Sequence, residues 1–143
     1  MKILEPKSKE DIELYYDIRW RILRKPWNQP RGSEKDDKEE TSIHIMAFRE
    51  DGIPVGTGRA HFNSEEEAQI RYMAVEENQR GNGTGGLILK ELEKRAKEKG
   101  AKYVILNARD SAVSFYEKHG YKLIQKSHTL FNTIPHFLMK KNI

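Results

Sequence analysis

The sequence predicts an α/β protein in which a mixed β-sheet carries helices on both faces. Two apolar runs, residues 42–48 and 53–62, flank the Asp51-Gly52 pair that is typical of a β-hairpin. Further along, residues 69–106 read as a strand, a glycine-rich loop, an amphipathic helix and an unbroken apolar run. A helical crossover of this kind joins parallel strands. We therefore expect a sheet that is antiparallel early and parallel in the middle.

The first 40 residues predict a short strand followed by a helix. Residues 2–4 form the strand, and Ser8 is placed to cap a helix that runs to Arg24. The buried stripe of this helix is expected to consist of Leu14, Ile18 and Ile22 at a spacing of four, together with Tyr15. Pro26 and Pro30 end it, and the polar stretch to residue 40 has room for a short second helix.

The second half predicts the remaining helices and strands. Residues 87–99 place Ile88, Leu92 and Ala96 on one helix face, and Gly100 follows as the residue that ends the helix. Residues 103–106 read as a strand buried on both faces. Asp110 is expected to cap a helix that runs to residue 118. Two more strands, near residues 121–125 and 136–140, complete the chain.

Composition limits the classes of protein that this chain can be. Its 143 residues make one domain, 1–143, with no linker, and it contains no cysteine. Disulfides, cysteine-based metal sites and thiol nucleophiles are therefore excluded from this chain. No stretch approaches the roughly 18 apolar residues that a membrane span needs, and no apolar signal segment opens the chain. We expect a soluble, cytoplasmic protein with no membrane partner.

The charge pattern argues against a nucleic-acid partner. Lys and Arg number 26 against 22 Asp and Glu, which gives a net charge of +4. Basic residues alternate with acids, as in the i,i+4 pair of Glu91 and Arg95, instead of gathering into a patch. The one acid-rich run, residues 33–40, is expected to be a mobile exposed loop.

The glycine-rich loop at residues 81–86 predicts a phosphate site. Glycine N–H groups at the start of a helix, together with the helix dipole, favour an anion. Arg80 adds a positive charge and Thr84 adds a hydroxyl. A dinucleotide fold fits poorly, because residues 76–80 separate the loop from the strand and no acidic ribose ligand follows. A Walker loop is absent, because no Gly-Lys-Ser/Thr occurs.

Two motifs together resemble those of the GCN5-related N-acetyltransferase (GNAT) superfamily. Arg80-x-x-Gly83-x-Gly85 is similar to its acetyl-CoA signature, and residues 107–121, NARDSAVSFYEKHGY, are similar to its second hallmark. The resemblance covers about residues 70–121. It implies a GNAT-like acyl-CoA N-acyltransferase fold, acetyl-CoA as cosubstrate and no metal.

The resemblance also implies where acetyl-CoA binds. The parallel strands would splay apart, and the pantetheine would pair with the main chain of the first strand, as in β-augmentation. A backbone N–H near Met73 or Ala74 would stabilise the oxyanion of the tetrahedral intermediate. The cosubstrate-binding residues implied in this way are Met73, Ala74, Val75, Arg80, Gly81, Asn82, Gly83, Thr84, Gly85, Asn107 and Phe115.

Tyr116 and His128 are the candidate catalytic residues. Tyr116 matches the family's tyrosine that donates a proton to the leaving sulfur, and a phenol with a pKa of about 10 is protonated at neutral pH. A packing role beside Phe115 is the alternative. His128 is a candidate general base, with a surface histidine or a water chain as alternatives. His128 and His136 lack a carboxylate motif nearby, so no metal site is predicted.

The expected activity is direct transfer of an acetyl group to a primary amine, because no cysteine is present to carry it. The acceptor stays open between a small molecule and a protein amine, and the acyl group could be longer than acetyl. Residues 26–31, which include Trp27, and residues 128–136 are expected to wall the acceptor, with the acid-rich run drawing in a cationic amine. A non-catalytic acyl-CoA-binding sensor or scaffold is the alternative function. A homodimer through the last strands is compatible with the sequence.

Overall fold

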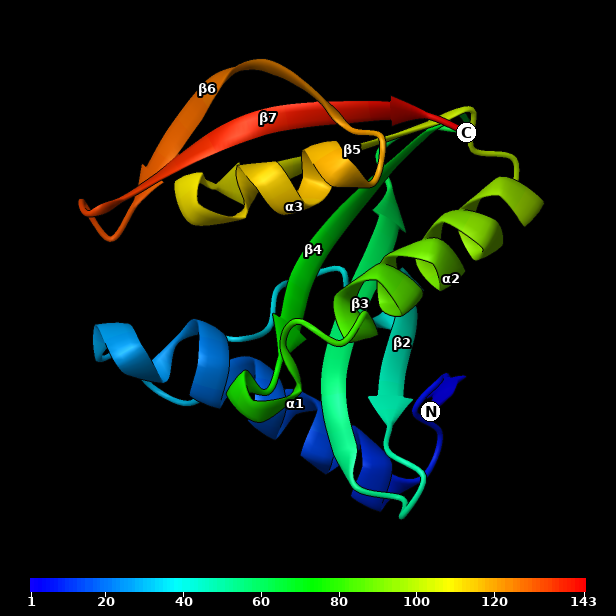
Figure 1. Cartoon of the computed structure of the whole chain (residues 1–143), viewed down its shortest axis with the longest axis vertical. Helices are drawn as coiled ribbons and strands as arrows, with labels where there is room; N and C mark the ends of the chain where they lie inside the picture. Colours follow the sequence, from blue (N-terminus) through cyan, green and yellow to red (C-terminus); the bar gives the residue numbers. More distant parts are fainter.

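The computed structural model describes residues 1–143 and contains one seven-stranded sheet with the strand order β1-β2-β3-β4-β5-β7-β6 (Figure 1). The strands are β1 (Lys2–Leu4), β2 (Ile43–Phe48), β3 (Pro54–Phe62), β4 (Glu67–Val75), β5 (Tyr103–Arg109), β6 (Lys122–Leu130) and β7 (Ile134–Asn142). Only β4 and β5 pair in parallel; every other neighbouring pair is antiparallel. The predicted mixed sheet is confirmed.

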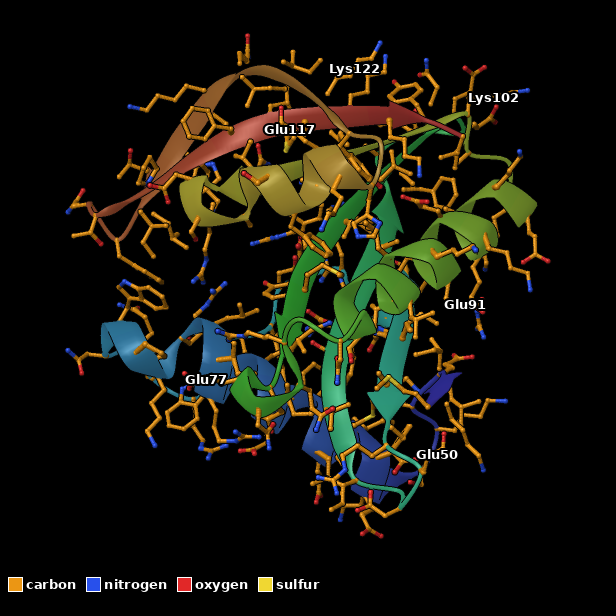
Figure 2. The ribbon with its side chains drawn as sticks, viewed as in Figure 1. Glu50, Glu77, Glu91, Lys102, Glu117 and Lys122 are labelled. Atoms are coloured by element: carbon orange, nitrogen blue, oxygen red, sulfur yellow. The ribbon has the colours of Figure 1, made fainter.

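Three α-helices and four 3-10 turns connect the strands. They are α1 (Lys9–Leu23), α2 (Thr84–Glu98), α3 (Val113–Lys118), η1 (Lys25–Trp27), η2 (Glu39–Thr41), η3 (Glu77–Gln79) and η4 (Asp110–Ala112). In Figure 1, β2 to β4 run nearly vertically, while β6 and β7 cross the top of the view. Charged side chains surround the molecule, among them Glu50 beside the β2–β3 hairpin and Lys122 on β6 (Figure 2). No helix has the length and apolar character needed to cross a membrane.

Helices cover both faces of the sheet, as predicted. The larger core lies on the face that α2 and α3 cover and includes Ile88 and Leu92. A smaller core lies under α1 and includes Tyr15 and Ile18. Gly58 on β3 lets α2 approach closely, since a Cβ there would lie 2.6 Å from Ile88 and 2.8 Å from Leu92. The two cores therefore meet the same sheet from opposite sides.

Helix α1 begins as predicted but buries only part of the predicted stripe. The Ser8 hydroxyl accepts a hydrogen bond from the backbone N–H of Asp11 at 3.0 Å, which confirms the cap. Of the predicted stripe Tyr15 and Ile18 are buried, whereas Leu14 is 37% exposed and Ile22 is half-buried. The prediction was wrong for Leu14 and Ile22, because the buried face of the helix includes Arg19. It consists of Tyr15, Ile18, Arg19 and Leu23.

The acid-rich run is not a mobile exposed loop, which corrects the prediction. Asp36 accepts from Arg59 Nη2 at 3.0 Å, and Glu39 accepts from Arg59 Nη1 at 2.9 Å and from Arg19 Nη1 at 3.0 Å. Both guanidinium groups have no exposed surface. Buried cations are costly without carboxylate partners, and for Arg19 and Arg59 this run supplies them. We call Arg19, Arg59, Asp36 and Glu39 the arginine clamp.

Several boundaries differ from those expected. Helix α2 begins at Thr84 instead of residue 87, and no second helix forms between residues 31 and 40 except the turn η2. Asp110 lies in η4, and the N-cap of α3 is Ala112 instead. The last two strands are longer than predicted and form a ribbon at the edge of the sheet. The outer strand β6 is almost wholly exposed, so no pattern of buried apolar residues shows in the sequence where this strand begins and ends.

Candidate functional site

A cleft opens in the middle of the sheet, where β4 and β5 separate. The two strands pair from Glu67 with Tyr103 to Ile70 with Leu106, and no pairing follows. β4 continues to Val75 and β5 to Arg109 without a common partner, so backbone groups on their facing edges are not used by the sheet. The cleft holds about 400 Å³ and is lined by both strand ends together with parts of α1, α3, β6 and β7.

A bulge in β4 accompanies the separation. Tyr72 has a φ of +58°, which is rare for a residue with a side chain. The register between β3 and β4 shifts between Thr57 and Arg59, opposite this residue. The buried Thr57 hydroxyl donates to the Tyr72 carbonyl at 3.0 Å and so satisfies the bulged backbone. Bulges bend a strand and redirect its side chains, which accounts for the turn of β4 away from β5.

The glycine-rich loop lies at the start of α2, as the sequence predicted. Gly83 is the N-cap residue with a φ of +88°, a conformation that favours glycine, and no side chain caps the first N–H groups of the helix. Arg80 donates from Nε to the Val75 carbonyl at 3.0 Å. The Thr84 hydroxyl is buried and donates to Asn82 Oδ1 at 2.8 Å, so it ties the loop together. The loop therefore offers backbone N–H groups to a ligand.

The structure brings most of the predicted site residues together. Met73, Asn107, Tyr116 and His128 all line the cleft. The others lie beside it: Ala74 and Val75 complete β4, Arg80, Gly81, Asn82 and Gly83 form the loop, and Thr84 and Gly85 are the first residues of α2. Phe115 connects the loop with α3, because a Cβ at Gly85 would lie 3.1 Å from its ring. The two sequence motifs thus form one continuous surface.

Tyr116 presents a phenol to the cleft. The residue is only 8% exposed and lies edge-on to Phe115, with ring centroids 5.0 Å apart. Its hydroxyl forms no hydrogen bond within the protein, and the residue lines the cleft. Burial raises the pKa of Tyr116 well above its usual value, while the charge of Arg109 acts in the opposite direction. The hydroxyl is therefore protonated at neutral pH and free to donate.

His128 is stacked on His136, with ring centroids 4.5 Å apart and an interplanar angle of 12°. His136 Nδ1 lies 2.9 Å from the Ile134 carbonyl, which can only accept, so Nδ1 carries the proton and Nε2 of the neutral ring has a lone pair. Burial lowers the pKa of His136. The Ile134 carbonyl and Asp110 raise this pKa, and His128 and Arg109 lower it. Nowhere do three or more His, Cys, Asp or Glu side chains gather as a metal site would require.

Sequence reasoning missed the role of His136 in this pair and the arginines of the cleft. His136 lies opposite Arg109 in the β5–β7 register, a pairing that no local pattern predicts. Arg24, Arg71 and Arg109 line the cleft, and neither Asp nor Glu does. Arg109 falls inside the second sequence motif, which is the one signal that could have identified it.

The two segments expected to wall the acceptor do meet. Trp27 in η1 stacks on Phe131 in the β6–β7 turn, with ring centroids 6.3 Å apart and an interplanar angle of 26°. The Arg109 guanidinium lies 4.5 Å from the centre of the Trp27 ring, and that of Arg24 lies 5.8 Å from the centre of the Phe131 ring. This stack lies over the arginines on the α1 side of the cleft. That it binds an acceptor stays a prediction.

Known proteins share this fold and sequence. The model of the acetyltransferase (GNAT) family matches residues 12–121. An uncharacterized N-acetyltransferase of Bacillus subtilis, YjcF, is 36% identical over 143 residues, which covers 99% of this chain and 100% of that protein.

Two solved structures resemble the fold across nearly all of this chain. An aminoglycoside 6'-N-acetyltransferase complexed with coenzyme A has a TM-score of 0.82 at 18% identity, over 99% of this chain and 97% of that one. A GNAT family acetyltransferase from Elizabethkingia anophelis with acetyl-CoA bound has a TM-score of 0.78 at 16% identity, with the same coverage. At these identities the likeness shows the fold.

Proposed function

The chain belongs to the acetyltransferase (GNAT) family, and we propose that it transfers the acetyl group of acetyl-CoA directly to a primary amine. The observation that carries this proposal is the free hydroxyl of Tyr116 in the cleft between β4 and β5. Neighbours of the same fold with coenzyme A or acetyl-CoA bound support the choice of cosubstrate.

In this proposal acetyl-CoA enters between the separated strands. Its pantetheine amides pair with the unused backbone edge of Met73, Ala74 and Val75, in the manner of an added strand. Asn107, on the opposite wall, hydrogen-bonds the same arm. The pyrophosphate lies on the loop at residues 80–85, where the backbone N–H groups and the positive end of α2 favour an anion. The thioester then reaches the centre of the cleft.

Transfer proceeds through a tetrahedral intermediate. The amine nitrogen attacks the thioester carbonyl carbon, and a backbone N–H near Met73 or Ala74 stabilises the oxyanion. When the C–S bond breaks, the Tyr116 hydroxyl donates its proton to the sulfur. In this proposal the stacked pair of His128 and His136 is the base that takes the proton from the amine. The products are free CoA and an acetylated amine, and proton exchange with solvent restores the phenol of Tyr116 and the neutral imidazole.

A non-catalytic acyl-CoA sensor would need the loop but not a free phenol in the cleft, so the enzyme is the better-supported function. A homodimer stays a prediction. Strand β6 is a sheet edge on which Leu123 and Ile124 are about half exposed, and this edge is the surface it would use.

Calorimetric titration with acetyl-CoA tests the site. Gly83→Glu adds a side chain and a negative charge where the pyrophosphate would lie, so we expect affinity to fall by at least about tenfold. Gly52→Glu is the matched control, because Gly52 has a similar φ of +86° and open space around it, in the β2–β3 hairpin. Equal affinities for the folded Gly83→Glu variant and the control would refute the loop assignment.

A panel of amines, assayed by thiol release from acetyl-CoA, tests turnover. Release that depends on an amine supports the enzyme. Tight acetyl-CoA binding without release on any amine, small or peptidic, would favour the sensor instead.

A further inference from the structure

Resting on the proposed function, we infer that the acceptor is a small amine with an anionic group, a carboxylate or a phosphonate-like oxyanion, that Arg24 and Arg109 bind on the α1 side of the cleft. This assigns a binding site and a substrate class together. The protein leaves both guanidinium groups without a carboxylate counter-charge.

Arg24 is buried, with an exposed fraction of 9%, yet it has no carboxylate partner. Its Nε donates to the Ser33 carbonyl at 2.9 Å and its Nη1 to the Leu23 carbonyl at 3.1 Å. It also contacts the rings of Tyr72 and Phe131, and the nearby charges of Arg71 and Arg19 are positive like its own. Carbonyl groups at the end of α1 offset part of a positive charge but supply no full negative charge. Arg24 can therefore still pair with an anion.

The side chain of Arg109 has even fewer polar partners than that of Arg24. It is half-buried, makes no hydrogen bond or ion pair with the rest of the protein, and only stacks on Trp27 at 4.5 Å. Burial lowers the pKa of Arg109, and the positive charges of Arg24 and Arg80 lower it further. Tyr116 acts in the opposite direction and raises this pKa. Two cations that disfavour each other in a partly desolvated site are costly without an anion.

The cleft itself offers no compensating acid. None of its lining residues is Asp or Glu. The third lining arginine, Arg71, already pairs with Asp36 at 2.9 Å and belongs with the clamp. Of the acid-rich run, which we expect from the sequence to attract a cationic amine, Asp36 and Glu39 are engaged in the same way. The charge of the cleft therefore favours an acceptor with a negative group and disfavours a polyamine.

Arg109 projects to the other face of the sheet from the start of α2, although the charge of Arg80 in the phosphate loop still acts on it. Val104, Leu106 and Ala108 on β5 point into the core that α2 and α3 cover. Arg109 lies one residue further on, so its side chain projects to the opposite face, where it meets Trp27. The phosphate loop begins α2 on the first face. An anion held by Arg109 thus approaches the thioester from the α1 side, as an acceptor would.

The size of the site points to a small acceptor. The cleft of about 400 Å³ must hold the pantetheine arm as well as the acceptor, and the stack of Trp27 on Phe131 lies over its α1 side. A guanidinium group binds a carboxylate or a phosphonate through two parallel hydrogen bonds, which fixes the orientation of a small ligand. Because His136 neighbours Arg109 across β5 and β7, the stacked His128 and His136 lie beside the anion site, and they reach the amine only if few bonds separate it from the anionic group.

Product-like ligands test this inference without needing turnover. Protein saturated with CoA is titrated by calorimetry with N-acetylglycine, N-acetyl-β-alanine, N-acetyl-4-aminobutyrate and N-acetyl-2-aminoethylphosphonate. Each acid is compared with its neutral amide or ester, and N-acetylputrescine serves as the cationic probe. We expect at least one acid to bind about tenfold or more tightly than its neutral counterpart and than the cation.

Three variants locate the effect. Arg24→Gln and Arg109→Gln should each weaken the preferred acid by about tenfold or more while CoA affinity stays within about twofold. Arg49→Gln is the control, because Arg49 pairs with Asp51 in the exposed hairpin, and it should change neither affinity.

Two results would overturn the inference while the proposed function stands. One is CoA binding with no acid preferred over its neutral counterpart. The other is a loss of CoA affinity alone in the arginine variants, which would give these arginines to the cosubstrate. Failure of the wild-type protein to bind CoA would instead refute the proposed function, and the inference with it.

Discussion

Two groups of arginines lie on the α1 face, and they differ in what neutralises them. In the arginine clamp, Arg19 and Arg59 have no exposed surface and pair with Asp36 and Glu39. In the cleft, Arg24 and Arg109 have no carboxylate partner. The ring of Tyr72 contacts both groups, since its centre lies 4.3 Å from the Arg19 guanidinium and 5.6 Å from that of Arg24.

The difference separates a structural role from a binding role. A buried cation with carboxylate partners from a distant segment fixes that segment, and the clamp holds residues 33–41 against α1 and β3. A buried cation without a partner contributes no such link and lowers stability until an anion arrives. Stability measurements on variants of one residue from each group therefore test whether the two groups of arginines differ in role.

The largest expected effect comes from the clamp. Arg59→Met leaves Asp36 and Glu39 partly buried with fewer cations, so the free energy of unfolding should fall by about 3–5 kcal/mol. Urea denaturation measures it. Arg49→Met removes an exposed ion pair and should cost less than about 1 kcal/mol. Similar losses in the two variants would mean that the clamp has no special structural role.

A smaller effect should appear in the way the free energy of unfolding depends on pH. Partial burial acts to raise the pKa of Asp36, but hydrogen bonds from Arg59 and the Lys38 backbone outweigh it and hold that pKa well below its usual value. A depressed carboxyl pKa stabilises the folded state above the unfolded pKa of about 3.9, and this stability disappears as the pH falls through the folded pKa.

Comparison with Asp36→Asn measures this contribution. Denaturation of both proteins between pH 7 and pH 2.5 should show the largest difference in unfolding free energy near neutrality and a shrinking difference below about pH 4. A constant difference across this range would mean that the charge of Asp36 does not support the clamp.

The smallest effect is expected in the cleft. Arg109→Met removes a charge that has no partner and keeps most of the contact with Trp27, so the unfolding free energy should change by no more than about 1 kcal/mol, in either direction. Urea denaturation in the same buffer as for Arg59→Met gives the matched value. A loss of about 3 kcal/mol or more would make Arg109 structural and remove the contrast between the two groups.

The α2 side of the molecule could be predicted from the sequence, and the α1 side could not. Gly83 and the helix that follows act through local chemistry, a positive φ and a helix start, which a short motif specifies. The hairpin at Gly52 and the Ser8 cap are local in the same way. Local rules therefore recovered the order of the elements and the glycine loop at the start of α2.

The α1 side depends on contacts between residues that lie far apart in the sequence. Arg19 looks like a surface residue in the sequence, and it is buried only because Glu39, 20 residues away, accepts its charge. That pair shifted the buried face of α1 and turned an apparently mobile acidic run into an ordered one. The stack of His128 on His136 likewise depends on the register of β6 on β7, where irregularities intervene. Neither distance in sequence nor residue type alone reveals such partners.

The central claim is that Tyr116 donates the proton to the leaving thiolate, and a single-turnover measurement tests it most directly. Tyr116→Phe keeps the ring that packs on Phe115 and removes only the hydroxyl. Tyr103→Phe is the control, since Tyr103 lies at the start of β5 outside the cleft lining.

With acetyl-CoA and the best amine of the thiol-release panel, we expect Tyr116→Phe to slow acetyl transfer by about 10²–10⁴-fold. Acetyl-CoA affinity should stay within about twofold, and Tyr103→Phe should transfer at the wild-type rate. A transfer rate in Tyr116→Phe equal to that of the wild type would contradict the account and leave Tyr116 as a packing residue.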